Sequence, residues 1–125
     1  MKNNPIEIPK GKVCNLTSLT EMMFGKKHLI LDIIDTFLKQ APEELLNLQL
    51  AVQNCDFPQI KNSAHSMKSS VFIMGISSLS PVLSEIESLG GSATGITEIE
   101  ELNSQLKLIC KTAIEELENE RVNYL

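Results

Sequence analysis

The sequence predicts an all-α protein, an antiparallel up-down four-helix bundle with a short extra helix on its N-terminal side. Three observations support this fold class. Apolar residues recur every three or four positions over long stretches, and no stretch alternates apolar and polar residues as a half-buried strand would. The apolar residues are mostly Leu, Ile and Met, which favour helices. A chain of 125 residues, 42% of them hydrophobic, is long enough for one domain with its own core.

The N-terminal part is expected to hold an arm and one short helix. Residues 1–13 contain two prolines and show no helical period, so we interpret them as an extended arm. The bundle domain is assigned to residues 14–125. Within it, a short helix at residues 16–24 is expected to end at Gly25.

The next two helices carry most of the apolar periodicity. The second runs from about Lys26 to Val52 with Pro42 in its middle. A proline inside a helix removes one main-chain hydrogen bond, so either the helix kinks there or a new helix begins at the proline. The third helix is expected to start after Asp56, a good N-cap, and to stop at Gly75.

Two further helices complete the predicted bundle. The fourth is expected to begin at residues 77–78, where a serine can cap it, and to close at the glycine pair 90–91. A small, polar loop follows. Thr97 and Glu100 have the spacing of a capping box, so the fifth helix is expected to begin there.

The third helix has one apolar face and one distinctive polar face. Its inward seam is formed by Ile60, Ala64, Met67, Val71 and Met74. At 100° per residue, His65 points about 140° away from the centre of that seam. Lys61, His65, Lys68 and Phe72 follow one another at intervals of four, three and four residues, so they line one outward stripe. Ser69 lies nearly opposite the core.

An outward histidine beside a lysine has a chemical use. A neutral imidazole nitrogen is a nucleophile. Phosphoryl transfer asks a protein mainly for position and for positive charge near the phosphate oxygens. Lys68, one turn from His65, can place an ammonium beside a phosphate on the ring. An exposed Phe72 on the same stripe suits a docking partner better than water.

The residues around His65 also resemble a known family. Residues 64–70 read Ala-His-Ser-Met-Lys-Ser-Ser and Gly75 follows, which is similar to the histidine phosphotransfer motif Ala-His-x-Leu-Lys-Gly-(Ser/Ala). Residues 37–43, Phe-Leu-Lys-Gln-Ala-Pro-Glu, resemble the segment upstream of that motif. Residues 83–87, Leu-Ser-Glu-Ile-Glu, resemble the pattern of the helix that follows it.

This resemblance to histidine-containing phosphotransfer domains implies roles for several residues. It makes His65 the phosphoacceptor and Lys68 the residue that stabilises the phosphate, while Ser70 matches the small residue that often follows. Gln40 is a candidate for a hydrogen bond near His65. The expected binding surface also includes Lys61, Ser69, Phe72 and Gly75. The family usually has Gly where this chain has Ser69, and we expect the added hydroxymethyl group to be tolerated but to narrow the choice of partner.

The resemblance also implies a mechanism and partners. A receiver domain bearing phospho-aspartate would dock over His65, transfer its phosphoryl group and supply the Mg²⁺, so the chain needs no cofactor or metal of its own. A second receiver would then take the group, and a hybrid sensor histidine kinase would stand upstream. The sequence has no Gly-rich nucleotide loop, so no autokinase activity is expected. A bundle with polar outer faces is expected to be a monomer.

The charge balance supports this choice of partners. The chain carries 16 acidic and 11 basic residues, a formal net charge of -5. A nucleic-acid binder or a protein of anionic membrane surfaces would need basic segments, so we expect neither partner. No apolar run approaches the roughly 20 residues that span a bilayer. The three cysteines form no CxxC pair, which is typical of reduced thiols in the cytoplasm.

Two other functions remain open from the sequence. The first is a helical adaptor that binds receiver or kinase domains without being phosphorylated, and Ser69 is the one feature that hints at it. The second is a bundle enzyme with a metal or cofactor. That enzyme would need inward carboxylates and histidines at Glu-x-x-His spacing, which the sequence lacks.

Overall fold

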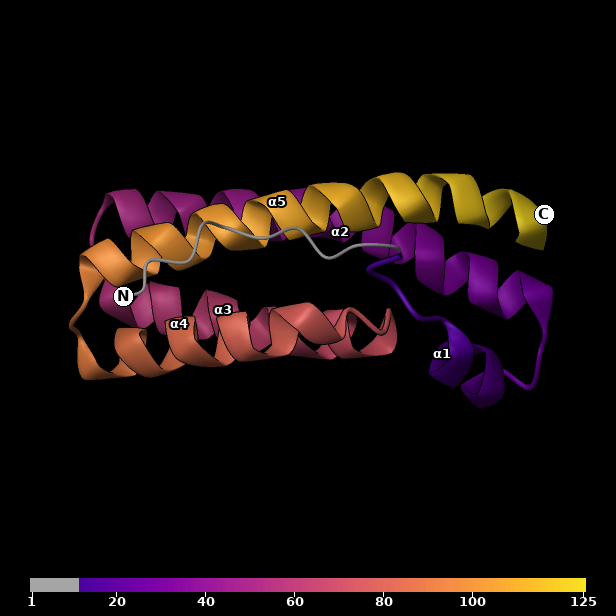
Figure 1. Ribbon diagram of the computed structural model, residues 1–125, viewed down its shortest axis with the longest axis horizontal. Coiled ribbons are helices and arrows are strands. Elements are labelled where there is room, and N and C mark those ends of the chain that lie inside the picture. The colour runs from indigo at the N-terminus through magenta and orange to yellow at the C-terminus, as the bar shows by residue number, and fades with distance from the viewer. Residues whose placement is uncertain (1–11) are drawn as a thin grey trace.

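The computed structural model describes residues 12–125, and it confirms the all-α class: these residues form helices and no strand (Figure 1). Residues 1–11 of the expected arm lie outside the described part. The α-helices are α1 (Thr17–Met22), α2 (Lys27–Gln53), α3 (Phe57–Ile73), α4 (Ser80–Ser92) and α5 (Ile96–Glu120). Two short 3-10 helices, η1 (Ser77–Leu79) and η2 (Arg121–Tyr124), precede α4 and follow α5.

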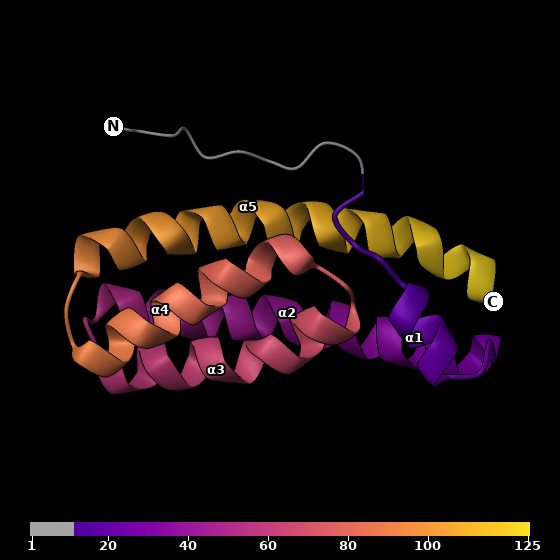
Figure 2. The same cartoon turned by 60° about the horizontal axis from the view of Figure 1, so that its bottom comes forward.

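The four long helices form the bundle, and each packs against two neighbours in the circular order α2, α3, α4, α5. In Figure 1, α2 and α5 lie together in one layer and α3 and α4 in the other. Lys107 reaches Gln49 and Arg121 reaches Asp35, so α2 and α5 run in opposite directions. The short helix α1 lies at one end of the bundle, beside the start of α2 (Figure 2).

The sequence of α3 explains both of its ends and its buried face. The Asp56 side chain caps the first turn by accepting a hydrogen bond from the Gln59 N–H at 3.3 Å. Gly75, with φ at +65°, follows the last turn. The predicted seam of five apolar residues is confirmed, because every one of them is buried. This places the opposite face of α3, with His65, toward solvent.

The helix-boundary predictions for α4 and α5 are wrong, and one of the two alternatives for α2 is excluded. Helix α2 is continuous through Pro42, so no new helix begins there. Helix α4 does not close at the glycine pair but continues through residues 90–91 to Ser92. A Cβ on Gly90 would lie 2.9 Å from the Lys61 backbone nitrogen, so the glycine allows α3 and α4 to approach closely.

The start of α5 also differs from the capping-box prediction. The helix begins at Ile96 with Gly95 as its N-cap at φ +72°, and no side chain caps it. The Thr97–Glu100 capping box is therefore wrong. The N-cap lies two residues before the predicted Thr97, and Ile99 in this first turn is fully buried in the core, so the turn is fixed by packing rather than by a capping side chain.

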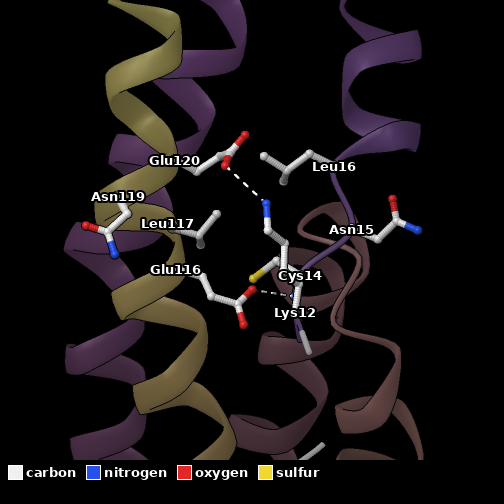
Figure 3. Close-up of a pocket in the computed structure, with 8 residues that line it drawn as sticks. All are labelled: Lys12, Cys14, Asn15, Leu16, Glu116, Leu117, Asn119 and Glu120. Carbon is white, nitrogen blue, oxygen red and sulfur yellow. Dashed lines mark hydrogen bonds and ion pairs between the residues drawn. The ribbon is translucent and has the colours of Figure 1, made fainter. Parts of the chain in front are cut away.

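The segment before α1 ties α5 to the end of α3 at one end of the bundle. The N–H groups of Val13 and Cys14 donate to the Glu116 carboxylate at 2.7 and 3.0 Å. Figure 3 shows Glu116 beside Cys14 at this crossing. The next residue, Asn15, donates its N–H to the Met74 carbonyl at 3.2 Å. Residues 13–15 therefore strap the C-terminal half of α5 to the end of α3.

Candidate functional site

His65 stands on the outer face of α3. Its side chain is 72% exposed, as the helical wheel predicts. The ring is not free to turn, however, because Nδ1 lies 2.7 Å from Oε2 of Glu87 on the neighbouring helix α4. An exposed but oriented imidazole is the central feature of this surface.

Glu87 contacts the predicted lysine as well. Its second oxygen, Oε1, forms an ion pair with Lys68 Nζ, so a single carboxylate joins both residues. The hydrogen bond from Lys68, followed by that from His65, lowers the pKa of Glu87 below its ordinary value. We therefore treat Glu87 as ionised at neutral pH.

The ionised carboxylate determines which ring nitrogen is reactive. A carboxylate without its proton can only accept hydrogen bonds, so Nδ1 of His65 must carry the hydrogen between the two groups. In the neutral ring the other nitrogen, Nε2, then keeps its lone pair. The arrangement presents a nucleophilic nitrogen with a lysine ammonium one helical turn away.

Three other predicted residues share the exposed face of α3 with His65. Lys61 lies one turn before it, and its side chain passes over Gly91 of α4. Ser69 is exposed one turn after it. Phe72 lies a further turn along and is 71% exposed. These three side chains surround His65 along the helix.

In the described part of the chain, the remaining predicted residues form no hydrogen bond with the imidazole of His65. Gln40 is exposed on α2, and within residues 12–125 it forms no hydrogen bond with His65. Ser70 is half-buried, and its Oγ donates to the Met67 carbonyl at 3.2 Å. Gly75 lies at the far end of α3, where a Cβ would meet the backbone of Asn15.

Sequence reasoning did not assign a role to Glu87. Residues 83–87 resemble the family pattern, but that resemblance gives Glu87 no role of its own. The contact between Glu87 and His65 could have been found from the position of the turn between α3 and α4. In an antiparallel helix pair, residues equally distant from the turn face each other. His65 and Glu87 are 22 residues apart, with Ile76 in that turn at the midpoint.

The described residues contain no group of three or more His, Cys, Asp or Glu side chains that could hold a metal ion. Among the same residues, no helix combines the length and the apolar character needed to cross a bilayer.

Comparison with known proteins agrees with this geometry. A family model described as the Hpt domain matches residues 32–120, from α2 to the end of α5. The chain belongs to the Hpt domain family, and it therefore has a phosphotransfer role in two-component signalling. Searches of curated proteins and of solved structures gave no match.

Proposed function

We propose that this protein carries a phosphoryl group on Nε2 of His65, taking it from a receiver-domain phospho-aspartate and passing it to a second receiver. The observation that carries the proposal is the hydrogen bond between Nδ1 and Glu87, which leaves Nε2 unprotonated on an exposed ring. Family membership supports the phosphotransfer role, and the geometry supports the choice of atom.

The transfer step balances without a further reactant. The Nε2 lone pair attacks phosphorus in line, the bond between phosphorus and the aspartate oxygen breaks, and the carboxylate leaves with the electron pair. The ring becomes a phosphorylated imidazolium whose Nδ1 proton stays hydrogen-bonded to Glu87. In the second step an aspartate of the accepting receiver attacks phosphorus, and the N–P bond breaks to restore the neutral ring.

Lys68 is proposed to stabilise the phosphate through its positive charge. Its ammonium already contacts Glu87, so on phosphorylation it has two anionic neighbours on the same side of His65. Positive charge near the phosphate oxygens stabilises the transferring group. The proposed Mg²⁺ comes from the receiver, and the chain contributes no cofactor and no autokinase activity.

The residues around His65 are proposed to contact the partners. Phe72 would meet an apolar surface of the receiver, and Lys61 would meet its acidic groups. Ser69 would also face the docked domain, since it is exposed one turn from the histidine. Gln40 lies on another helix and Ser70 is half-buried, so they are weaker members of this surface, and Gly75, against the backbone of Asn15 at the far end of α3, is proposed to act in the fold rather than in binding. We place the exchange in the cytoplasm, with a hybrid sensor kinase upstream.

The test uses a receiver labelled with phosphate on its aspartate. We expect acid-labile label to appear on the wild-type chain and to be lost with His65→Ala. Label that persists in this variant would refute the assignment. If no label is taken up and receiver affinity is the same for wild type and His65→Ala, the adaptor function is favoured instead.

A second pair of variants tests the role of Glu87 as a positioning residue. Glu87→Gln removes the charge that fixes the proton on Nδ1, so we expect the rate of transfer to fall about tenfold, equivalent to about 1.4 kcal/mol. The control is Glu85→Gln, an exposed carboxylate on the same helix that contacts neither His65 nor Lys68 in the described residues. The pH profile of the rate should change only in Glu87→Gln, since only this variant alters the group bonded to the ring.

A further inference from the structure

The side of the bundle away from His65 has an apolar groove. It has a volume of about 640 Å³ and lies between α2 and α5. Its apolar lining comes from Pro42, Leu45 and Leu46 on α2 and from Leu108 and Ile114 on α5. Leu46 is 55% exposed and Leu108 is 39% exposed, so this lining is open to solvent. Single exposed leucines are ordinary, but here exposed leucines from two helices line one groove, which makes it a candidate contact surface.

The charges beside the groove have a defined order. All of them lie on α5, with Lys107 and Lys111 at one end and Glu115 and Glu118 at the other. The α2 side adds only uncharged residues. A second α5 running in the opposite direction would place its glutamates over these lysines and its lysines over these glutamates. The surface is therefore complementary in charge to a copy of itself.

We propose that two copies of this chain associate through the α2–α5 face about a two-fold axis that crosses the helices. In this arrangement α5 packs antiparallel to its counterpart, and the apolar groove lining of one copy covers that of the other. The proposal does not depend on the transfer mechanism, and it departs from the monomer that polar outer faces would favour.

The face is large enough for such a contact. Helix α5 has 25 residues and is therefore about 38 Å long, and two adjacent helices span about 20 Å. Such a face offers about 700 Å² from each copy, close to the roughly 800 Å² per partner of a standard interface. The flanking Lys–Glu pairs would set its direction rather than supply most of its affinity.

The position of this face leaves the histidines accessible. Since α2 and α5 form one layer and α3 and α4 the other, the proposed contact lies on the opposite side of the bundle from the pair His65–Glu87 (Figure 1). Each copy of a dimer would present its own His65 outward. Association and phosphotransfer can therefore be measured separately.

The first test is analytical ultracentrifugation of the purified chain over a wide range of concentrations. We expect a monomer–dimer equilibrium that Leu46→Glu shifts to monomer. The matched control is Phe72→Glu, which places the same charge on an exposed apolar residue of α3 and should leave the equilibrium unchanged. Circular dichroism shows whether each variant remains folded.

The second test reverses the charges. Lys111→Glu places two acidic groups against each other across the axis and should weaken the dimer, as Glu115→Lys should with two basic groups. The double variant restores opposite charges and should recover association. A monomeric wild type at every concentration overturns the proposal and leaves the groove to a partner of another kind. A dimer that is insensitive to Leu46→Glu overturns it as well.

Discussion

Gly75 gives the sharpest structural prediction, because a side chain at this position is disfavoured for two separate reasons. Its φ of +65° lies in the left-handed region, where a side chain is disfavoured. A Cβ at this position would also lie 2.0 Å from the carbonyl oxygen of Asn15. That oxygen cannot move away easily, since Asn15 also donates its N–H to the Met74 carbonyl. Gly75→Ala should therefore destabilise the end of α3 and the strap that crosses it.

The magnitude follows from the two costs. A left-handed residue with a side chain costs about 1–2 kcal/mol, and forcing an extra methyl group into packed backbone costs about 1–3 kcal/mol. We expect Gly75→Ala to lower the free energy of unfolding by about 2–5 kcal/mol. Gly25 is the matched control, because its φ is +69° but no atom lies within 4 Å of its Cβ position. Gly25→Ala should therefore lose only the first cost.

Urea unfolding followed by circular dichroism measures both variants. The difference between them isolates the close approach to Asn15 and should be about 1–3 kcal/mol. Equal losses of unfolding free energy in the two variants would refute the reasoning. They would mean that residues 13–15 move away from the new methyl group without any loss of stability. Transfer by the folded fraction should be unchanged in Gly75→Ala, since the site is about 15 Å along the helix from His65. Reduced transfer at native stability would instead assign Gly75 to binding.

Three further predictions concern stability. Burial raises the pKa of Glu44, so the folded state holds this proton more tightly and stability falls as pH rises through the window between the unfolded and folded values. Glu44→Gln should then be more stable than wild type at neutral pH and not at acid pH, in urea titrations at both; a gain at acid pH would contradict this. The hydrogen bond from Arg121 lowers the pKa of Asp35, so its stabilisation is present above the ordinary carboxyl pKa and is lost as pH falls through the folded value. The deficit of Asp35→Asn should accordingly shrink in acid, and a deficit independent of pH would exclude the ion pair as its cause. Leu83 is fully buried, so Leu83→Ala should cost about 2–5 kcal/mol in the same assay; a loss below this range would mean that the core closes around the missing side chain.

The parts of the fold that the sequence predicted are those that depend on one helix at a time. The period of apolar residues in α3 is set by the geometry of the helix itself, so the buried seam could be predicted. A helix stop was predicted at the glycine pair 90–91, and a kink or a new helix at Pro42, but α4 continues through the glycines and α2 through the proline. Gly90 lies against the backbone of Lys61 on α3, and no single-helix pattern contains that contact.

The candidate site also has one contact that the sequence could predict and one that it could not. Lys68 lies one turn from His65 on the same helix, so its proximity follows from spacing alone. Glu87 reaches the ring from α4, and its contact depends on where the turn between the helices falls. The strap at residues 13–15 shows the same limitation, because its partner Glu116 is about a hundred positions away in the sequence.

The proposed phosphocarrier has to accept a phosphoryl group and also release it, and Glu87 bears on both requirements. Before transfer, its charge keeps the proton on Nδ1 and the lone pair on Nε2. After transfer, the same carboxylate still contacts Lys68, so the ammonium is divided between two anions rather than committed to the phosphate. A cation that bound only the phosphorylated state would stabilise that state and slow the second transfer, since catalysis depends on differential stabilisation. It follows that removing the carboxylate should slow both steps: Glu87→Gln should accept phosphate more slowly and, once phosphorylated, hold it longer against a second receiver. Pulse-chase transfer from a labelled receiver to an unlabelled second receiver measures both rates in one experiment, and a variant that is slower to accept but faster to release would contradict this account of Lys68.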